Sequence, residues 1–157
     1  MTTTITGANG IDNIKAATGA VLQVVTASDG AQLSTTTTSF IDTGLSVAIT
    51  PSSTSSRIKV EFYFESVYFA AGSDHGCSFR ILRGSTALYT PQANHCFYTT
   101  QSAGTTYLPF NFLEIDSPST TSAITYKVQI GLHVANSVVL NYAGKFKSTI
   151  VATEIAG

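Results

Sequence analysis

The sequence predicts an all-β protein, an antiparallel β-sandwich of the jelly-roll type. From Val21 onward apolar residues recur with a period of two rather than 3.6, as in strands that bury one face. The chain contains 24 Thr and 18 Ser, which favour strands and turns respectively. Turn signals divide it into about eight to eleven strands, and eight long strands in roughly 135 residues suit a jelly roll.

The length of 157 residues fits one domain preceded by an arm. Residues 1–20 contain no aromatic residue and few large apolar ones, so they cannot build a core of their own. They form either a loose terminus or an arm that orders on a neighbouring subunit. We therefore divide the chain into an N-terminal anchoring arm, 1–20, and a head domain, 21–157. The expected apolar anchors of the arm are Ile5, Ile11 and Ile14.

Two runs show the strand pattern most clearly. In 57–70, Ile58 and Val60 alternate with Lys59 and Glu61, and 122–135 alternates in the same way. The expected strands are 21–27, 38–42, 45–50, 57–70, 77–83, 86–90, 95–100, 106–116, 122–135, 137–142 and 147–156.

Turn residues separate these runs. Asp29-Gly30 predicts a hairpin, because this dipeptide adopts the tight turn that joins paired strands. The Ser-rich segments 51–56 (PSSTSS) and 116–122 (DSPSTTS) interrupt the alternation and predict loops. Gly84-Ser85 predicts a shorter turn.

Some strands are apolar on both faces. In 57–70 the odd-numbered face becomes apolar at Val67 and Phe69. The strands 106–116 and 147–156 carry apolar residues at both odd and even positions. A second apolar face needs a cover besides the core, either a loop of the same chain or a neighbouring protomer. We favour a neighbour around a threefold axis. The expected subunit interface is Val67, Phe69, Tyr107, Leu113, Ile115, Val151 and Ile155.

Composition excludes several classes. A net charge of −1 with eight scattered Lys and Arg argues against nucleic acid and against anionic membranes as partners. No apolar run approaches the roughly 20 residues of a membrane-spanning helix. The first ten residues lack the basic and apolar stretches of a signal peptide. Charged residues make up only 11% of the chain, a surface suited to an assembly.

No metal site is expected. His75, Cys77, His95 and Cys96 are zinc-ligand types, but their spacing matches no standard zinc motif, and neighbours on a strand point to opposite faces. Without a signal peptide the two cysteines imply no disulfide, and we expect two thiols that behave as small apolar residues.

No catalytic machinery is expected either. Glu114 and Asp116 lie about 7 Å apart on one strand face, at the lower end of an inverting glycosidase separation. Initiation of the following Ser/Pro loop explains Asp116 better. The chain contains no nucleophile-elbow, P-loop, dinucleotide or zinc-protease motif, so we expect neither an enzyme nor a cofactor.

The segment 91–103 is a candidate recognition loop. Neutral amides and tyrosine suit sugar hydroxyls or adaptable protein contacts, although an ordinary polar loop has the same composition. The candidate receptor-facing residues are Gln92, Asn94, His95, Tyr98 and Gln101.

Four segments, taken together and in order, resemble a group of tailed-bacteriophage virion proteins. They are SFIDTGLSVAITPSSTSSRIKV (39–60), SFRILRGSTAL (78–88), FLEIDSPSTTSAITYKVQIG (112–131) and STIVATEIAG (148–157). The group includes tail-fibre tips and head-fibre or decoration proteins. The resemblance implies a trimeric jelly-roll head, similar to C1q and tumour-necrosis-factor heads, with no catalytic residues. The stretches 67–77 and 90–104 depart from the pattern.

These observations predict a homotrimeric structural protein on the virion surface, made in the host cytoplasm. It would be a capsid decoration (cement) protein or a head fibre anchored through its arm, because the chain has no shaft, repeat or tail-docking domain. The alternative is a short tail fibre, a receptor-binding protein whose distal loops bind a host surface glycan or protein. The expected partners are copies of itself and other virion proteins, with no nucleic acid and no membrane insertion.

Overall fold

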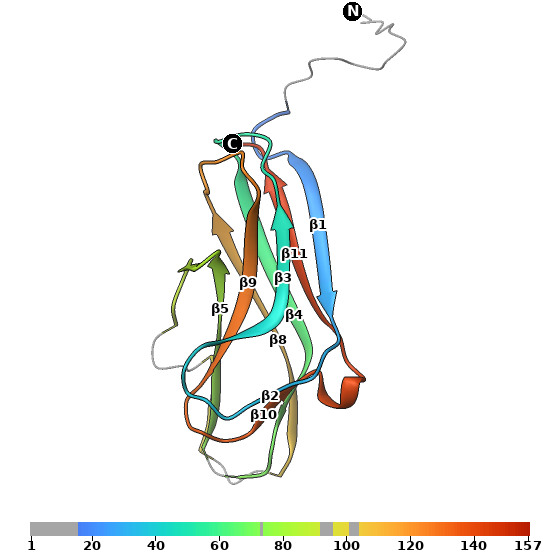
Figure 1. Ribbon diagram of the computed structural model, residues 1–157, viewed down its shortest axis with the longest axis vertical. Helices are drawn as coiled ribbons and strands as arrows, with labels where there is room; N and C mark the ends of the chain where they lie inside the picture. The colour runs from blue at the N-terminus through green and yellow to red at the C-terminus, as the bar shows by residue number, and fades with distance from the viewer. Residues whose placement is uncertain (1–15, 73, 92–95, 101–103) are drawn as a thin grey trace, which may run out of the picture.

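Strands dominate the computed structural model of the chain, which describes residues 16–72, 74–91, 96–100 and 104–157. They form two antiparallel sheets packed face to face, so the predicted β-sandwich is confirmed (Figure 1). The first sheet contains β1 (Val21–Asp29), β2 (Leu33–Thr35), β4 (Arg57–Phe69), β8 (Thr106–Asp116), β10 (Val138–Leu140) and β11 (Ser148–Ile155). The second contains β3 (Ile41–Ile49), β5 (His75–Arg83), β6 (Thr86–Ala87), β7 (Phe97–Thr99) and β9 (Ile124–Leu132). Within the described residues no helix is long and apolar enough to cross a membrane.

The strand order is that of a jelly roll. In the first sheet β4 pairs with β11 and β10 along one edge and with β8 along the other, and β1 and β2 flank β11 and β10. In the second sheet β9 lies between β3 and β5, and the short strands β6 and β7 pair with opposite ends of β5. Treating β1/β2, β6/β7 and β10/β11 as three interrupted strands leaves eight positions, ordered 1-8-3-6 and 2-7-4-5. This double Greek key defines the jelly roll.

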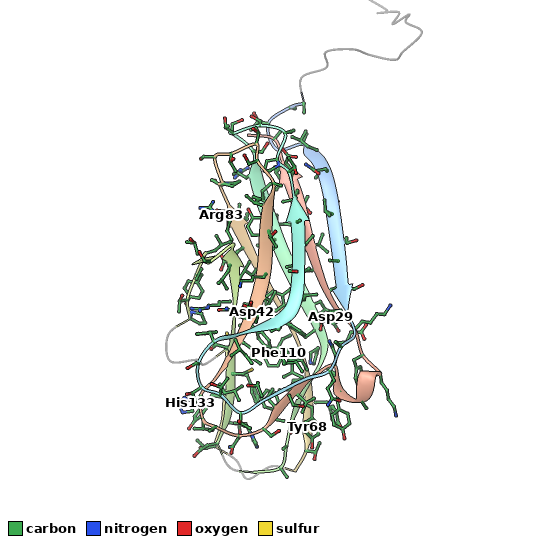
Figure 2. All side chains as sticks on the ribbon, in the orientation of Figure 1. Asp29, Asp42, Tyr68, Arg83, Phe110 and His133 are labelled. Atoms are coloured by element: carbon green, nitrogen blue, oxygen red, sulfur yellow. The ribbon has the colours of Figure 1, made fainter. Side chains whose placement is uncertain are left out.

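The core lies between the two sheets and is rich in aromatic rings. Phe79 of β5 lies 5.0 Å from Phe64 and 5.3 Å from Phe110 between ring centroids, which joins the second sheet to the first (Figure 2). Such tilted and offset pairs are the preferred aromatic geometries. Buried aliphatic residues extend the core along the sandwich: Leu45, Val47, Ile49, Ile58, Val60, Ile81, Val128, Ile130, Leu132, Leu140 and Ile150.

A β-bulge interrupts the alternation of β4. The pairing with β8 jumps from Phe64–Phe110 to Val67–Leu108, so Glu65 and Ser66 together oppose the single residue Pro109. A proline has no N–H to donate, and prolines in sheets occur at edges and bulges. The extra residue in β4 moves every later side chain to the other face.

This bulge corrects the expectation for two interface residues. Val67 and Phe69 were expected on the second apolar face, but they are 0% and 1% exposed and belong to the core. Tyr68 takes the outward position instead and pairs with Tyr107. Val67 and Phe69 are therefore not available to another subunit.

Two other sequence predictions are wrong in detail. The predicted strands 38–42 and 45–50 are one strand, β3, with a register shift between Asp42 and Ser46 around Gly44. Asp29-Gly30 makes a turn but no hairpin, because β1 pairs with β11 while β2 pairs with β10. The Asp29 carboxylate accepts a hydrogen bond from the Ala31 N–H (2.8 Å), which forms the turn locally without pairing its two flanks.

The first described residues and the C-terminus lie at the same end of the sandwich, which we call the terminal end (Figure 1). The Ala156 N–H donates to the Ala20 carbonyl, and the Gly19 N–H donates to the Ala156 carbonyl, both at 2.8 Å. The Ser-rich loops β3–β4 and β8–β9 lie at this end as well. The connections β4–β5 and β9–β10 lie at the opposite end, which we call the distal end.

A buried carboxylate fastens the β3–β4 loop at the terminal end. Glu154 is 0% exposed and accepts hydrogen bonds from the Ser52 N–H and hydroxyl (both 2.7 Å), the Ser56 hydroxyl (2.6 Å) and the Gln23 amide (2.5 Å). Burial raises the pKa of the Glu154 carboxyl, but these bonds outweigh it and lower the pKa to about 2. The glutamate therefore stays ionised, although no cation pairs with it among the described residues.

A second buried network joins the two sheets near the β8–β9 loop. Arg83 of β5 forms an ion pair with Asp116 of β8, with its Nη1 atom 3.0 Å from both carboxylate oxygens. The Tyr126 hydroxyl of β9 donates to the same carboxylate at 2.6 Å, and burial raises the pKa of this phenol. The four segments that carry the phage resemblance supply Ser52, Arg83, Asp116, Tyr126 and Glu154, so they meet at the terminal end and hold its loops.

Candidate interaction surface

The solvent-facing side of the first sheet is the candidate interaction surface, and we call it the outer face. Side chains of directly paired residues share a face of the sheet. The pairs place Ile115 beside Lys59, and Leu113 beside Glu61, which in turn neighbours Val151. Residues separated by up to 92 positions in sequence thus form one continuous surface.

Aliphatic side chains remain exposed on this face. The exposed fractions are 56% for Val24, 48% for Leu113 and 54% for Ile115, while Val151 and Ile155 are half-buried. Val21 is 61% exposed and pairs with Ile155 at the terminal end. Single exposed apolar residues are ordinary, but a set gathered on one sheet face is typical of a contact surface. We call this set the outer patch: Val21, Val24, Leu113, Ile115, Val151 and Ile155.

An ion pair crosses the middle of the outer patch. The Lys59 Nζ lies 3.0 Å from the Glu61 carboxylate, between the aliphatic residues of β8 and those of β11. These two charges pair with each other, and Arg57, which neighbours Ile155 on the same face, is a further exposed charge. A contact that buries the outer patch therefore also covers charged groups.

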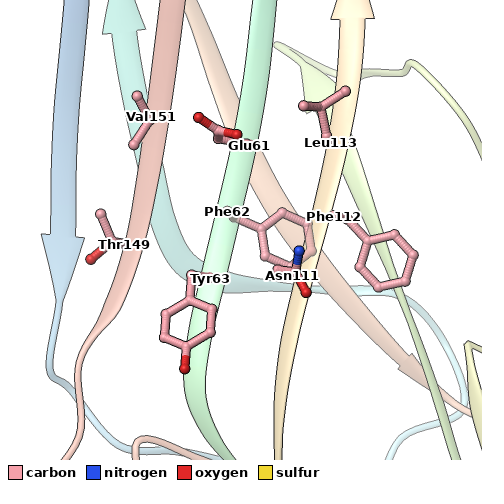
Figure 3. Close-up of a pocket in the computed structure, with 8 residues that line it drawn as sticks. All are labelled: Glu61, Phe62, Tyr63, Asn111, Phe112, Leu113, Thr149 and Val151. Carbon is pink, nitrogen blue, oxygen red and sulfur yellow. The ribbon is translucent and has the colours of Figure 1, made fainter.

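The outer face is hollowed beside this ion pair. A depression of about 570 Å³ runs across β8, β4 and β11, as Figure 3 shows. Leu113 and Asn111 stand on one side, Val151 and Thr149 on the other, and Glu61 and Tyr63 lie between them (Figure 3). The shape offers a shallow seat for a protruding side chain or loop.

The structure places five of the predicted interface residues on this one face. Leu113, Ile115, Val151 and Ile155 lie in the outer patch, and Tyr107 lies on the same face toward the distal end. Their contact with another subunit stays a prediction.

Sequence reasoning missed the contribution of β1 to this face. Val21 and Val24 are more exposed than any of the residues that were predicted. The signal was present, because the run VLQVV carries apolar residues at both odd and even positions. The register shift between Val21 and Gln23 explains why its two faces could not be assigned from alternation alone.

β8 forms one lateral edge of the first sheet. Its residues other than Pro109 pair with β4, and no described strand pairs with its other edge. A long unpaired edge is open to strand addition, and a proline such as Pro109 removes one donor from it. Exposed Leu113 and Ile115 lie on this same strand, so the edge and the outer patch are continuous.

Of the predicted recognition residues, the structure describes Tyr98 alone. This tyrosine is 42% exposed near the distal end, where its hydroxyl donates to the Asp74 carboxylate (3.2 Å) and its ring lies 4.7 Å from that of His133. Asp74 has a positive φ of 58°. The other candidates lie outside the described residues: Gln92, Asn94, His95 and Gln101, and the arm anchors Ile5, Ile11 and Ile14.

Cys77, Cys96 and Asp116, three of the residues considered for metal or acid–base chemistry, have structural surroundings. No group of three or more metal-ligand side chains occurs in the described part of the chain. Cys77 and Cys96 are free thiols, and burial raises the pKa of the Cys77 thiol. A raised pKa keeps this thiol protonated and unreactive. Asp116, one of the two spaced carboxylates, is occupied by Arg83 and Tyr126.

Comparisons with known proteins found only weak similarity. No protein-family model and no curated protein matches the chain. A chain of the T13 particle of infectious bursal disease virus aligns with a TM-score of 0.44 at 18% identity, covering 86% of this chain and 36% of that one. A chain of the VP2 subviral particle of the same virus aligns with a TM-score of 0.44 at 16% identity, covering 86% and 37%. This chain spans little more than a third of their length, and the jelly-roll assignment rests on its own strand order.

Proposed function

We propose that the chain is a structural protein of a bacteriophage virion, built as a homotrimer that associates through the outer patch. It serves as a capsid decoration protein or a head fibre. The observation that carries the proposal is the gathering of exposed aliphatic side chains on one face of the β1–β11–β4–β8 sheet. The sequence resemblance to phage virion proteins supports the assignment of the chain to a bacteriophage particle.

Burial of the outer patch is favourable for a physical reason. Removing apolar surface from water contributes about 25 cal/mol per Å². Burying the Lys59–Glu61 ion pair together with the outer patch costs desolvation free energy, which the apolar contacts must exceed. In a threefold ring the outer patch of each copy contacts a different surface of the next copy, and closure of the ring avoids open fibres.

The molecule has a natural polarity for attachment. The described chain enters the sandwich at the terminal end (Figure 1), and we propose that residues 1–20 act as the attachment arm there. Backbone hydrogen bonds and small apolar anchors on partner subunits would then order this arm. The distal end consequently faces outward from the particle.

Light scattering on the purified full chain tests the assembly state. We expect a mass of about three times 16.5 kDa. A protein that stays at the monomer mass as its concentration is raised contradicts the homotrimer.

A short tail fibre that binds a host receptor is the second candidate, favoured by exposed tyrosines toward the distal end such as Tyr98 and Tyr107. Copy number in purified particles separates the two roles. Hundreds of copies per particle are expected for decoration, and tens at most for a fibre. Attachment of the isolated protein to host cells supports the fibre.

A further inference from the structure

Three tyrosines form an aromatic cluster on the outer face, toward the distal end. The rings of Tyr68 and Tyr142 stack with centroids 4.6 Å apart at 19°, and Tyr107 meets them edge-on at 5.2 and 5.7 Å. Figure 2 marks Tyr68 near the lower end of the sandwich. Tyr107 is 48% and Tyr142 is 36% exposed, and among the described residues no hydrogen bond engages their hydroxyls. We call Tyr68, Tyr107 and Tyr142 the tyrosine cluster.

The turn that carries Tyr142 is held in an unusual conformation. Asn141, Ala143 and Gly144 have φ values of 52°, 58° and 64°, in the left-handed region. Glycine adopts this region freely and asparagine tolerates it, but alanine does so at a cost in free energy. Strained residues persist where their surroundings over-determine them, and they concentrate at functional sites.

Hydrogen bonds of the Asn141 side chain hold its left-handed backbone conformation in place. Its buried side-chain amide donates to the carbonyls of Asp29 (3.2 Å) and Ala31 (3.0 Å). Its side-chain oxygen accepts a hydrogen bond from the Ser148 hydroxyl at 2.8 Å. Three hydrogen bonds from two separate segments therefore fix the residue that precedes Tyr142.

The connection between β1 and β2 also holds Ala143. Its N–H donates to the Gln32 side-chain oxygen at 2.8 Å. Tyr142 itself is exposed rather than a core residue, so core packing alone does not account for the strain. The result of the arrangement is a tyrosine ring set rigidly against Tyr68 before any ligand arrives.

We propose that the tyrosine cluster is a binding site for a neutral carbohydrate. The C–H faces of a pyranose ring are apolar and carry partial positive charge, which suits the electron-rich face of an aromatic ring. Its hydroxyls lie around the rim, within reach of phenol groups that have no partner in the described protein. Tyrosine supplies a large amphipathic contact with few rotatable bonds, so binding orders little.

A second copy of the chain is the other occupant to consider, and the distribution of side chains disfavours it. Leu113, the member of the outer patch nearest the cluster, pairs with Glu61, which lies seven residues before Tyr68 along β4, about 23 Å at the rise of a strand. The outer patch is aliphatic, whereas the cluster consists of hydroxyl-bearing rings. The two surfaces thus differ in both place and chemistry.

An array of neutral hexose and N-acetylhexosamine oligosaccharides, probed with the full chain, tests the site. We expect binding to members of the array, and we expect Tyr142→Ala and Tyr107→Ala each to weaken the affinity by about tenfold, since each removes a stacking ring. Tyr142→Phe keeps the ring and should retain most of the affinity. The matched control is Tyr89→Ala, which removes a tyrosine of 57% exposure outside the cluster and should leave the affinity unchanged.

Several results would overturn the proposal. These are no binding to any neutral oligosaccharide of the array, or equal affinities for Tyr142→Ala and Tyr89→Ala. A fall in oligomer mass on Tyr142→Ala would assign the cluster to a contact between copies instead. Circular dichroism and the melting temperature of each variant show that it is folded. A trimer that binds no sugar refutes this site and leaves the proposed function standing.

Discussion

At the scale of single residues, Glu154 shows how a charge is kept inside the molecule without a cation. Its carboxylate is completely buried, and donors from the β3–β4 loop and β1 replace the water it lost. Hydrogen bonds to charged groups are stronger than neutral ones, and removing one partner leaves the others unsatisfied. The loop 51–56 is therefore attached to the C-terminal strand by a single side chain.

Replacing this carboxylate should destabilise the fold. We expect Glu154→Gln to lower the free energy of unfolding by about 2 kcal/mol or more at neutral pH, because an amide cannot accept from all four donors. Urea denaturation followed by circular dichroism measures the change. The matched control is Asp42→Asn on the second sheet, whose exposed ion pair with Lys127 contributes less than about 1 kcal/mol.

The same residue predicts a pH dependence. The folded-state pKa of Glu154 is about 2, below the ordinary value of 4.5, so the unfolded chain binds the proton more readily. The stabilisation is full above about pH 4.5 and is lost as the pH falls towards 2. A wild-type protein and a Glu154→Gln variant that lose stability equally over this window would contradict the assignment.

Sequence reasoning could not find this site. The position of Glu154 on the inner face follows from its alternation with Ile150 and Ala152, but a carboxylate there breaks the apolar pattern without naming its partners. Ser52 and Ser56 lie 102 and 98 residues away and are two of 18 serines. Only the fold brings these residues together, so the local sequence pattern could not predict the hydrogen-bond partners of the buried Glu154.

At the scale of elements, clear alternation predicted the strands well and failed where it was interrupted. β8 was predicted with its observed bounds, and β4 within one residue. The bulge opposite Pro109 was not predicted, because it depends on a residue of another strand. That single insertion exchanged the inward and outward positions of Val67, Tyr68 and Phe69 and so misplaced two of the interface residues.

Gly44 marks a second interruption, inside β3. Its φ is +88°, and a Cβ at this position would lie 2.8 Å from the Asp29 carboxylate. We expect Gly44→Ala to destabilise the fold by about 1–2 kcal/mol, because alanine is strained in this backbone region. Thermal denaturation measures the effect.

A second glycine supplies the control for this prediction. Gly104 has no atom of the described residues within 4 Å of the corresponding Cβ position and no positive φ. Gly104→Ala should therefore leave the melting temperature almost unchanged. If both substitutions lower it equally, the strain at Gly44 is not the cause.

At the scale of the whole molecule, the terminal end and the distal end differ in how they relate to the phage resemblance. The segments that resemble phage virion proteins supply the buried networks of the terminal end, through Ser52, Arg83, Asp116 and Glu154. Within the stretches that depart from the pattern, 67–77 and 90–104, the end of β4, the start of β5 and β7 lie toward the distal end (Figure 1). This distribution is expected if one end preserves the fold while the other meets a variable partner.

The outer patch predicts a separation between assembly and folding. Leu113→Glu places a charge in the proposed contact, so we expect the light-scattering mass to fall from the trimer to about 16.5 kDa. The free energy of unfolding of the monomer should change by less than about 0.5 kcal/mol, because the side chain is exposed.

A matched substitution outside the outer patch shows whether the position matters. Tyr89 is 57% exposed and lies just after β6, outside the outer patch, and Tyr89→Glu introduces the same charge there. This variant should keep the trimer mass. Dissociation by both variants alike would show a general effect of charge rather than a contact at the outer face.

The pairing of β1 with β11 has a mechanical consequence. A head domain that is tethered to the virion through its arm and held by a partner at its distal end would be pulled along the direction of β1. The ladder from Gln23–Glu154 to Asp29–Ser148 runs parallel to that pull, and antiparallel hydrogen bonds lie perpendicular to the strands. Tension would therefore strain all of these bonds simultaneously instead of unzipping them one at a time, a geometry suited to withstanding drag.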